Sequence, residues 1–514
     1  MSPEQMIEKV PYACGFDPIS ANKTGEWRFM TPDRVSRLSP CRQGCPLDGH
    51  IPGWLEAVKA EKWDEAWEIM SIYNPFPAIT GHVCFHPCTE NCNRGQLDEV
   101  IDIPGVERTI GEWRLANYQK PETPQTDKGD IAVVGSGPAG LSSAYYLAQA
   151  GYGVTVFERS GEIGGMLALG IPEYRLPRKV LQKEIAVLEK EGIKFVTSCN
   201  IGKDKSVADL FSEFDQVFFA TGAWIPRKAN IPGEKNSGVF NALDFLSRVN
   251  TGNPPELTES VVVIGGGNAA VDSARTALRM NGVNHVSLIY RRSRVEMPAD
   301  PVEVEAAERE GVELIFNARP REIITEKNEP TAVIFDHSKT NLEGLVVDSS
   351  RSFTKECGSV IMALGQEADH SLFGEINEER SVFAGGDLVT GPDTVPAAIR
   401  AGRIAALCIQ SAMEDLPLPE LELEFEKALA FEDLNLEAQV NLEFQQRQAE
   451  PVSEAARCLG CGTCTSCGIC YLFCPDLAVD LVDGRYEFNL DYCKGCGICV
   501  KECPSQALAM KGGR

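Results

Sequence analysis

The fold is decided by residues 131–159, IAVVGSGPAGLSSAYYLAQAGYGVTVFER. This stretch predicts an apolar strand, a glycine-rich turn, a helix and a second strand. Gly135, Gly137 and Gly140 form the pattern G-x-G-x-x-G. Gly135 permits the tight turn, Gly137 lets the backbone approach a pyrophosphate, and Gly140 lets helix and strand pack closely. Because a helix N-terminus attracts phosphate charge, the sequence predicts a dinucleotide site here.

A carboxylate supports this interpretation over the alternative of a glycine-rich turn without a ligand. Glu158 ends the second strand, 18 residues after Gly140, where it can hold ribose hydroxyls. Two later segments, VFFATGA (residues 217–223) and VFAGGD (residues 382–387), also read as strand ends. The second, followed by TVPAAIRAGRIAA, resembles the flavin-contacting segment of two-dinucleotide-domain flavoproteins. That resemblance implies FAD at this site, with Asp387 on the ribityl chain.

The pattern occurs a second time in residues 260–293, SVVVIGGGNAAVDSARTALRMNGVNHVSLIYRRS. Gly265, Gly267 and Ala270 fill the fingerprint, and the strand that follows ends in two arginines, Arg291 and Arg292. Tyr290 stands where the first copy has Glu158. A carboxylate would repel a 2′-phosphate, whereas paired guanidiniums bind it. We therefore predict NADPH rather than NADH; the alternative is that the arginines form only a solvated turn.

Two nested dinucleotide sites fit hydride transfer between nicotinamide and flavin, which needs no strong acid or base from the protein. We predict no catalytic triad or other catalytic residue. Disulfide reductases of this architecture carry a redox pair of cysteines beside the flavin. Residues 130–410 contain only three isolated cysteines, Cys199, Cys357 and Cys408, which disfavours that chemistry.

The end of the sequence carries its strongest metal signal. Two runs of the form C-x-x-C-x-x-C-x-x-x-C-P occupy residues 464–475 and 493–504. In the bacterial ferredoxin pattern, three cysteines of a run bind one [4Fe–4S] cluster and the fourth binds the other cluster. A zinc site needs no such paired arrangement. The pattern assigns one cluster to Cys464, Cys467, Cys470 and Cys503, and the second to Cys474, Cys493, Cys496 and Cys499.

Composition agrees with an intracellular redox protein. The chain has 514 residues, enough for three to five domains at about 100–200 residues each. Nineteen cysteines, with no export signal, favour metal ligation over disulfides, and we expect a cytoplasmic location. No apolar run approaches the roughly 18–20 residues of a membrane span. A net charge of −25 argues against nucleic acid and anionic membranes as partners.

Near the N-terminus, PCRQGCP (residues 40–46) precedes NPFPAITGHVCFHPCTENCNRGQLDE (residues 74–99). These motifs, followed by the FAD and NADPH fingerprints, resemble the glutamate synthase small-subunit family. That family includes the N-terminal half of dihydropyrimidine dehydrogenase and the large subunits of electron-bifurcating transhydrogenases. The resemblance covers residues 38–415 and implies two N-terminal [4Fe–4S] clusters. It assigns one of them to Cys45, Cys84, Cys88 and Glu107; His82 and His86 are expected to pack nearby.

The second N-terminal cluster lacks two of the family's ligands, because only Cys41 and Cys92 remain for it. It is therefore either lost or completed from elsewhere. Cys458 and Cys461 are spare at the other end of the chain, although their spacing leaves the register of the ferredoxin runs formally open. We hypothesise a composite cluster that pins the ferredoxin module onto the N-terminal domain, giving four clusters rather than three.

The predicted organisation follows from these motifs. The fold class is an α/β core of two Rossmann-like domains, flanked by an N-terminal α-helical iron–sulfur domain and a C-terminal bacterial-ferredoxin-like α+β domain. Helical periodicity is expected in residues 56–70 and 106–118. The predicted parts are an arm (1–40), a helical Fe–S domain (41–122), an FAD domain (128–250 and 366–415), an NADPH domain (251–365), a helical linker (416–456) and a ferredoxin domain (457–514).

We predict an NAD(P)H oxidoreductase subunit that passes electrons between NADPH, FAD and three or four [4Fe–4S] clusters. Its partner is expected to be ferredoxin or another redox subunit, and a bifurcating complex is one form that the resemblance implies. The alternatives are a glutamate synthase small subunit and a non-enzymatic electron-relay scaffold. The predicted dinucleotide-binding residues are Gly135, Gly137, Pro138, Ala139, Gly140, Glu158, Arg159, Gly165, Thr221, Gly222, Gly265, Gly267, Asn268, Ala269, Arg291, Arg292, Gly386 and Asp387.

Overall fold

The structure is a computed structural model that describes residues 25, 28–35, 37–119, 128–341, 344–375, 382–418, 427–439, 444–482 and 484–512. The chain forms two compact units. We call the one made from both chain ends the terminal unit; it comprises residues 1–77, 86–114 and 422–514. The central unit comprises residues 78–85 and 115–421.

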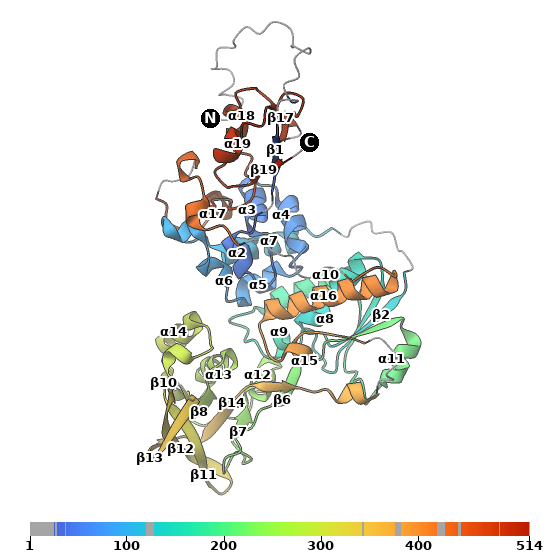
Figure 1. Ribbon diagram of the computed structural model, residues 1–514. Helices are drawn as coiled ribbons and strands as arrows, with labels where there is room; N and C mark the ends of the chain where they lie inside the picture. Colours follow the sequence, from blue (N-terminus) through green and yellow to red (C-terminus); the bar gives the residue numbers. More distant parts are fainter. Residues whose placement is uncertain are drawn as a thin grey trace. The chain divides into compact units, whose positions relative to one another are not determined.

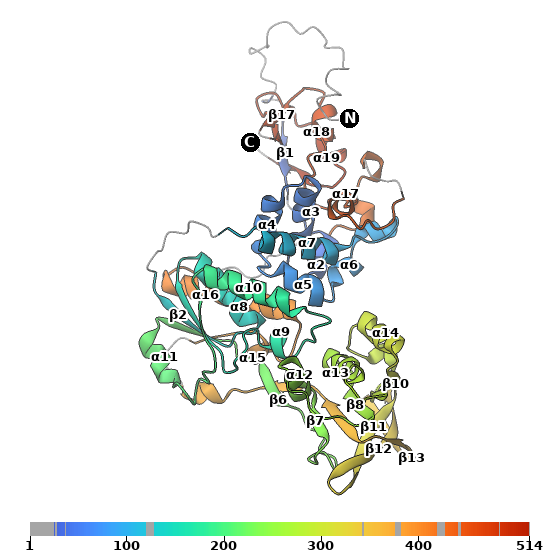
Figure 2. The same ribbon diagram turned by 180° about the vertical axis from the view of Figure 1, so that it is seen from behind.

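The first sheet of the central unit is parallel, with the strand order β16-β5-β2-β3-β4. Its inner strands are nearly continuous apolar runs and are buried, as parallel strands covered on both faces must be. Helices α8 and α16 lie side by side over this sheet (Figures 1 and 2). The strands are β2 (Asp130–Val134), β3 (Gly153–Phe157), β4 (Lys194–Val196), β5 (Gln216–Phe219) and β16 (Phe383–Ala384).

Seven helices accompany this sheet within the described part of the central unit. Gly402 lies on α16 where it crosses α8, and the Ser142 hydroxyl donates to the Ile399 carbonyl at 2.8 Å across the same crossing. The helices are α8 (Pro138–Gln149), α9 (Met166–Leu169), α10 (Arg178–Lys190), α11 (Val207–Glu213), the 3₁₀ helix η4 (Ser371–Glu375), α15 (Asp387–Thr390) and α16 (Val395–Met413).

The second sheet repeats this parallel arrangement, with the order β10-β9-β8-β14-β7. Its first strand in the chain, β7, begins at Val239, ahead of the boundary predicted at residue 251. Helix α12 packs in the core of this sheet as well. The elements are β7 (Val239–Asn241), α12 (Ala242–Asn250), β8 (Ser260–Gly265), α13 (Asn268–Leu278), β9 (His285–Ile289), η3 (Arg294–Glu296), α14 (Pro301–Glu310), β10 (Glu313–Ile315) and β14 (Ser359–Ala363).

Two smaller sheets complete the central unit. An antiparallel sheet of three long strands is inserted between β10 and β14, and a two-stranded sheet joins the two parallel sheets in sequence. They consist of β11 (Ala318–Glu326), β12 (Glu329–Asn341) and β13 (Gly344–Glu356), and of β6 (Ala223–Pro226) with β15 (Gln366–Ala368).

The N-terminal part of the terminal unit is helical, as predicted. The periodic stretch 56–70 is not one helix, however, because Glu61 adopts a left-handed conformation with φ of 57° and divides it. The two resulting helices pack their apolar faces on each other, whereas a single helix would have only one apolar face to bury. The elements are α2 (Pro40–Gly44), α3 (Ile51–Lys59), α4 (Trp63–Ser71), α6 (Pro87–Glu90), η2 (Asn93–Gln96) and α7 (Ile103–Ala116); α5 (Pro77–Val83) falls almost wholly in the central unit.

The C-terminal part of the terminal unit is a small α+β module. Its last strand, β19, pairs antiparallel with β1 near the N-terminus, from Met30 opposite Gly512 to Arg34 opposite Leu508 (Figure 1). Part of the predicted arm is therefore a strand of this module. The elements are β1 (Met30–Arg34), α18 (Ile469–Leu472), β17 (Val479–Val482), β18 (Arg485–Phe488), α19 (Ile498–Lys501) and β19 (Leu508–Gly512).

The predicted helical linker, residues 416–456, is wrong for much of its described part. Residues 427–439 hold only the 3₁₀ helices η5 (Phe431–Asp433) and η6 (Leu436–Ala438), and a short helix, α17 (Pro451–Ala456), follows. Side-chain amides replace the regular hydrogen bonds of a helix: Asn435 Nδ2 donates to Lys501 O at 3.1 Å, and Gln439 Nε2 to Pro504 O at 3.2 Å. Residues 419–426 and 440–443, like most of the polar segment 120–130, lie outside the described residues.

Across the ranges that the structure describes, no helix is both long and apolar enough to cross a lipid bilayer.

The crossing of α8 and α16 gives a test of the core. A Cβ at Gly402 would lie 2.1 Å from the Ala139 carbonyl oxygen, so Gly402→Ala must push the helices apart. Overpacking of this kind costs about 1–3 kcal/mol. We expect a lower midpoint in chemical denaturation. Gly374→Ala is the control, because its Cβ meets no atom within 4 Å; equal losses in both variants would contradict the crossing.

Candidate redox sites

The turn between β2 and α8 opens onto a cavity of about 600 Å³ in the central unit. Gly135 has φ of 106°, and a Cβ there would lie 2.4 Å from Ala220 O. A Cβ at Gly140 would lie 1.9 Å from Gly135 O, so this glycine packs under the turn. A Cβ at Gly137 would meet nothing within 4 Å. The backbone at Gly137 is therefore free to be approached by a ligand, as the fingerprint predicts.

Glu158 lies at the end of β3 and lines this cavity. The carboxylate is buried and accepts three hydrogen bonds, from Ser136 N at 3.0 Å, Ser136 Oγ at 2.6 Å and Ser160 N at 2.8 Å. The Ser136 hydroxyl in turn accepts from Gly164 N at 3.0 Å. Ser136 therefore fixes the carboxylate, a function that the sequence analysis missed. The signal was present, since Ser136 is the variable residue inside the glycine fingerprint.

Most other residues predicted for the first site line the same cavity. Arg159 places its guanidinium over the Trp224 ring, 4.4 Å from the centroid. Trp224 was not predicted, and its indole N–H donates to Thr221 O at 2.9 Å. The structure thus brings together residues at the carboxyl ends of β2 and β3, residues just after β5 and the start of α15. The predicted residues that line the cavity are Gly135, Gly137, Pro138, Ala139, Glu158, Arg159, Gly165, Thr221, Gly222, Gly386 and Asp387.

Asp387 carries a perturbed carboxyl at this cavity. Burial raises its pKa to about 6, against the effect of the Asp393 backbone N–H, which donates to the carboxylate at 3.3 Å. The N-terminus of α16 lines the cavity through Thr394, Val395 and Ala398. The N-terminus of a long helix and a half-buried acid at one cavity suit a large ligand that carries both anionic and hydroxyl groups.

The second fingerprint has the same local design. A Cβ at Gly265 would lie 2.3 Å from Ala363 O, whereas one at Gly267 would meet nothing within 4 Å. Asn268 begins α13 and its side chain accepts from Asp300 N at 2.9 Å; Ala269 follows on the same turn. Tyr290 packs its ring beneath the turn, where a Cβ at Gly266 would lie 2.3 Å from it. The aromatic ring thus fills the place of the carboxylate of the first copy.

The two arginines directly follow Tyr290 in the chain. Arg291 is exposed, and the Nε atom of Arg292 is buried with no hydrogen-bond partner among the residues that the structure describes. The neighbouring Arg294, in contrast, is paired, with Nη1 2.6 Å from Glu308 Oε1. Guanidinium donors at this position fit a phosphorylated ribose.

The C-terminal cysteines line two separate cavities in the terminal unit. Cys464, Cys467, Cys470 and Cys503 line one, together with Arg34 and Tyr486. Cys474, Cys493, Cys496 and Cys499 line the other, together with Pro32. The fold thus gathers the cysteines into the two groups that the ferredoxin pattern assigns, and their role as cluster ligands stays a prediction. Strand β1 adds Pro32 and Arg34 to the two cavities, which no C-terminal motif could have indicated.

In the helical part of the terminal unit, Cys45, Cys88 and Glu107 are largely buried. Glu107 Oε1 accepts from Asn74 Nδ2 at 2.8 Å, and His86 Nε2 lies 3.4 Å from Glu107 Oε2. Burial raises the pKa of Cys45 to about 11, and the Glu107 charge also raises it. Cys84 belongs to the segment 78–85 of the central unit, so its place in this ligand set stays a prediction.

The remaining four predicted ligands also lie in the terminal unit. Cys41, Cys92 and Cys458 pack against one apolar core, and Cys461 accepts a hydrogen bond from Asn93 Nδ2 at 3.5 Å. The described cysteines are all free of disulfides. Throughout the described ranges, no group of three or more His, Cys, Asp or Glu could hold a single metal ion.

Two parallel sheets with glycine turns, together with two cysteine-lined cavities, define an iron–sulfur flavoprotein oxidoreductase that binds FAD and a nicotinamide cofactor. The chain belongs to the pyridine nucleotide-disulphide oxidoreductase family, whose model matches residues 129–402. Residues 36–119 match dihydropyrimidine dehydrogenase domain II with a 4Fe-4S cluster, and residues 463–508 match a 4Fe-4S dicluster domain.

Curated relatives confirm the resemblance. The beta subunit of a Geobacter sulfurreducens NADPH-Fe(3+) oxidoreductase is 34% identical over 432 residues, covering 73% of this chain and 64% of that protein. The beta subunit of a Moorella thermoacetica NADP(+)-dependent formate dehydrogenase is 36% identical, with 72% and 59% covered. The Azospirillum brasilense glutamate synthase [NADPH] small chain is 32% identical, with 71% and 84% covered. The chain thus spans less than two thirds of the length of the first two.

One solved structure supports the fold. FprA from Mycobacterium tuberculosis, as its His57Gln mutant, has a TM-score of 0.50 at 18% identity and covers 56% of this chain and 85% of its own. This agrees with the central unit of two Rossmann-like sheets.

The half-buried carboxyl of Asp387 gives a pH-dependent prediction. Its folded-state pKa, about 6, lies above the ordinary value of 3.8, so its ionisation opposes folding above pH 6 and this cost disappears as the pH falls toward 4. In flavin-free protein, Asp387→Asn should therefore be no less stable than wild type at pH 8. Its affinity for FAD should nevertheless fall about tenfold, because a charge-assisted hydrogen bond is lost.

Thermal unfolding at pH 5 and pH 8, with flavin titration by fluorescence, measures both effects. Asp244→Asn removes an exposed carboxylate of the same unit and is the control. Unchanged FAD affinity in Asp387→Asn would contradict the assignment of Asp387 to the flavin site.

Proposed function

We propose that this chain is the NADPH-facing subunit of an iron–sulfur flavoprotein that exchanges electrons with ferredoxin or a partner redox subunit. The observation that carries the proposal is the pair of cysteine-lined cavities in a chain that also holds two dinucleotide turns. A chain that finished its chemistry on one small molecule would not need this many cluster sites. FAD, when bound, supplies the exchange between the electron pair of a nicotinamide and single electrons.

The residues of the central unit would hold the two dinucleotides. Gly137 and the start of α8 would bind the pyrophosphate of FAD. Glu158 would bind its ribose, and Asp387 its ribityl chain. Gly267 and the start of α13 repeat this for the nicotinamide cofactor. In this proposal no side chain has to move a proton, because hydride transfer between nicotinamide and flavin needs no acid or base from the protein.

The residues of the terminal unit would hold the clusters. The two ferredoxin-type sites use the ligand sets given above. The N-terminal site would take Cys45, Cys88 and Glu107 of this unit, and Asn74 would orient the carboxylate through its 2.8 Å hydrogen bond. Iron analysis of Glu107→Ala tests this set, with the exposed Glu112→Ala on the same helix as control.

Two relatives support the subunit status, since both are named as beta subunits of NADPH- or NADP-dependent complexes. A second candidate, the small subunit of a glutamate synthase, is supported by the Azospirillum relative, 84% of which is covered. The C-terminal dicluster module favours the first candidate, because it adds an exit for electrons. A bifurcating transhydrogenase complex is a specific form of the first.

Arg291 and Arg292 predict the choice of cofactor. Replacing both by Ala should raise the KM for NADPH by roughly 10- to 100-fold, since charge-assisted bonds to the 2′-phosphate are lost, and should leave NADH unaffected. Anaerobic bleaching of the flavin by each nicotinamide measures this. Arg294→Ala, which removes the arginine already paired with Glu308, is the matched control. Preference of the wild type for NADH would contradict the proposal, and no bleaching by either would favour an electron-relay scaffold.

Native purification without oxygen, followed by mass spectrometry, identifies the partner. We expect a second redox subunit or a ferredoxin-linked oxidoreductase. A large glutaminase-bearing partner would instead establish the glutamate synthase alternative. Isolation of the chain alone, still able to reduce ferredoxin, would contradict its status as a subunit.

A further inference from the structure

We propose that Cys41, Cys92, Cys458 and Cys461 bind a fourth [4Fe–4S] cluster, shared between the helical N-terminal segment and the C-terminal segment of the terminal unit. None of the matched domain models accounts for it, because the dicluster match begins at residue 463 and the N-terminal match ends at residue 119. The inference concerns metal content and stands independently of the partner or of the nicotinamide that the protein uses.

The four thiols come from four different turns that the fold brings together. Cys41 lies on α2, Cys92 directly before η2, Cys458 directly after α17, and Cys461 in the next turn. Cys41, Cys92 and Cys458 pack against one apolar core, which includes Ala455 of α17. Cys461 is buried as well, and Asn93, the neighbour of Cys92, donates to its sulfur at 3.5 Å.

The four thiols are shielded from solvent to different degrees, since Cys41, Cys92 and Cys458 are half-buried and Cys461 is buried. Four thiolates cannot be buried side by side without positive charge among them. Iron would supply that charge.

The loop around Cys461 is shaped for a cluster. Gly460 and Gly462 have φ of 65° and 71°, and the Gly460 N–H donates to Cys458 Sγ at 3.4 Å. The ferredoxin module has the same kind of bond, from Ala478 N to Cys474 Sγ at 3.2 Å. A Cβ at Gly462 would lie 2.4 Å from Arg37 O, so this loop rests on the segment that leads to Cys41. Hydrogen bonds to cluster sulfurs are a recognised means of tuning such sites.

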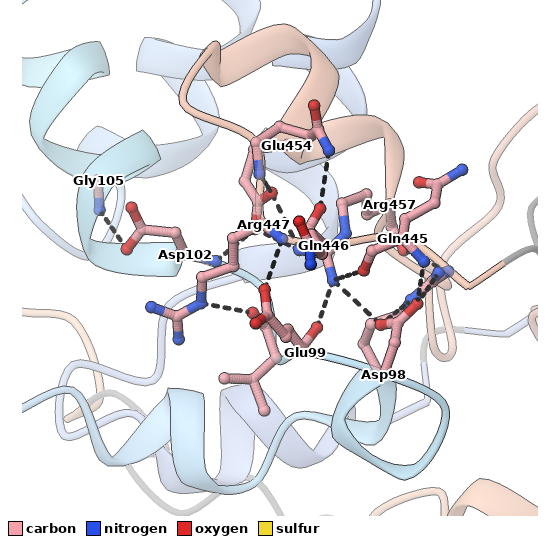
Figure 3. Close-up of polar contacts among 12 residues, drawn as sticks. Asp98, Glu99, Asp102, Gly105, Gln445, Gln446, Arg447, Glu454 and Arg457 are labelled. Carbon is pink, nitrogen blue, oxygen red and sulfur yellow. Dashed lines mark hydrogen bonds and ion pairs between the residues drawn. The ribbon is translucent and has the colours of Figure 1, made fainter.

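A buried ion network holds the two halves of the site in register (Figure 3). Arg457, directly before Cys458, is fully buried and donates to Glu454 at 2.7 Å and to Asp98 at 3.0 Å. Asp98 also pairs with Arg94, which follows Cys92 by two residues and whose Nη1 donates to Arg457 O at 3.2 Å. Glu454 in turn accepts from Asp102 N at 2.7 Å.

This network ties the backbone beside one pair of proposed ligands to the backbone beside the other pair. Gln445 N donates to Asp98 at 3.0 Å, and Arg447 N to Glu99 at 2.6 Å, so the C-terminal segment is anchored before it reaches Cys458 (Figure 3). Cys92 and Cys458 therefore have fixed positions before any metal binds, which suits a rigid cage of four irons.

The test is the iron content of the full chain, purified or reconstituted without oxygen. Four clusters correspond to about 16 irons and three to about 12. Wild type should hold about 16 irons and no zinc. Cys458→Ser/Cys461→Ser should lose about four irons, and so should Cys41→Ser, because both remove the same cluster. The variant that combines all three changes should also lose only about four.

If all four cysteines bind one cluster, the combined variant loses no more iron than each of the other two variants. If they belonged to two independent sites, the iron losses would add. Cys408→Ser, an unclustered cysteine of the central unit, should keep all its iron, and bleaching of the flavin by NADPH should persist in every variant. Wild-type protein with about 12 irons, one zinc per chain, or additive losses would each overturn the proposal. If the variants do not fold, native mass spectrometry of wild type decides, since a mass with only three clusters overturns it.

Discussion

The terminal unit depends on one buried interaction, the ion pair between Arg457 and Asp98, neither of whose side chains is exposed. Hydrogen bonds from Arg94 lower the pKa of Asp98 to about 2, so the carboxylate is charged at neutral pH. Removing one partner of such a pair leaves an uncompensated charge in the interior, at a cost of about 3–5 kcal/mol. The ion pair therefore fixes the position of two segments that are far apart in the sequence. It also fixes the nearby cysteines, Cys92 and Cys458, relative to each other.

Where function rests on local geometry, the sequence was sufficient. A glycine in a fingerprint has meaning within a few residues, so Gly135 and Gly140 could be assigned to a tight turn and a close contact, and Gly137 and Gly267 to open approach. The ferredoxin runs are similar, because their spacing fixes which thiols can reach one cage. The partner of Glu158 was missed although Ser136 lies inside the motif, since a hydroxyl at a variable position has no spacing rule that marks it.

Where function rests on long-range pairing, the sequence was not sufficient. Nothing in residues 30–34 indicates that they pair with residues 508–512, because strand pairing depends on a partner that the local pattern does not contain. The periodicity of residues 56–70 predicted one helix, but the structure has two short helices that pack on each other. The acidic linker looked helical, but Asn435 and Gln439 bond to backbone carbonyls of the ferredoxin module instead. The sequence likewise did not mark Arg94 and Arg457 as special, because only the fold shows that they are buried.

The pairing of β1 with β19 has a consequence for how the protein is made. A ribosome releases Met30–Arg34 early and Leu508–Gly512 only after several hundred further residues. During that interval the first strand lacks β19 and the helical core lacks α17, so the terminal unit can be completed only after the central unit has been synthesised. The two ferredoxin-type cavities, to which β1 contributes Arg34 and Pro32, are therefore bounded by a complete β1–β19 pair only after translation has passed residue 512.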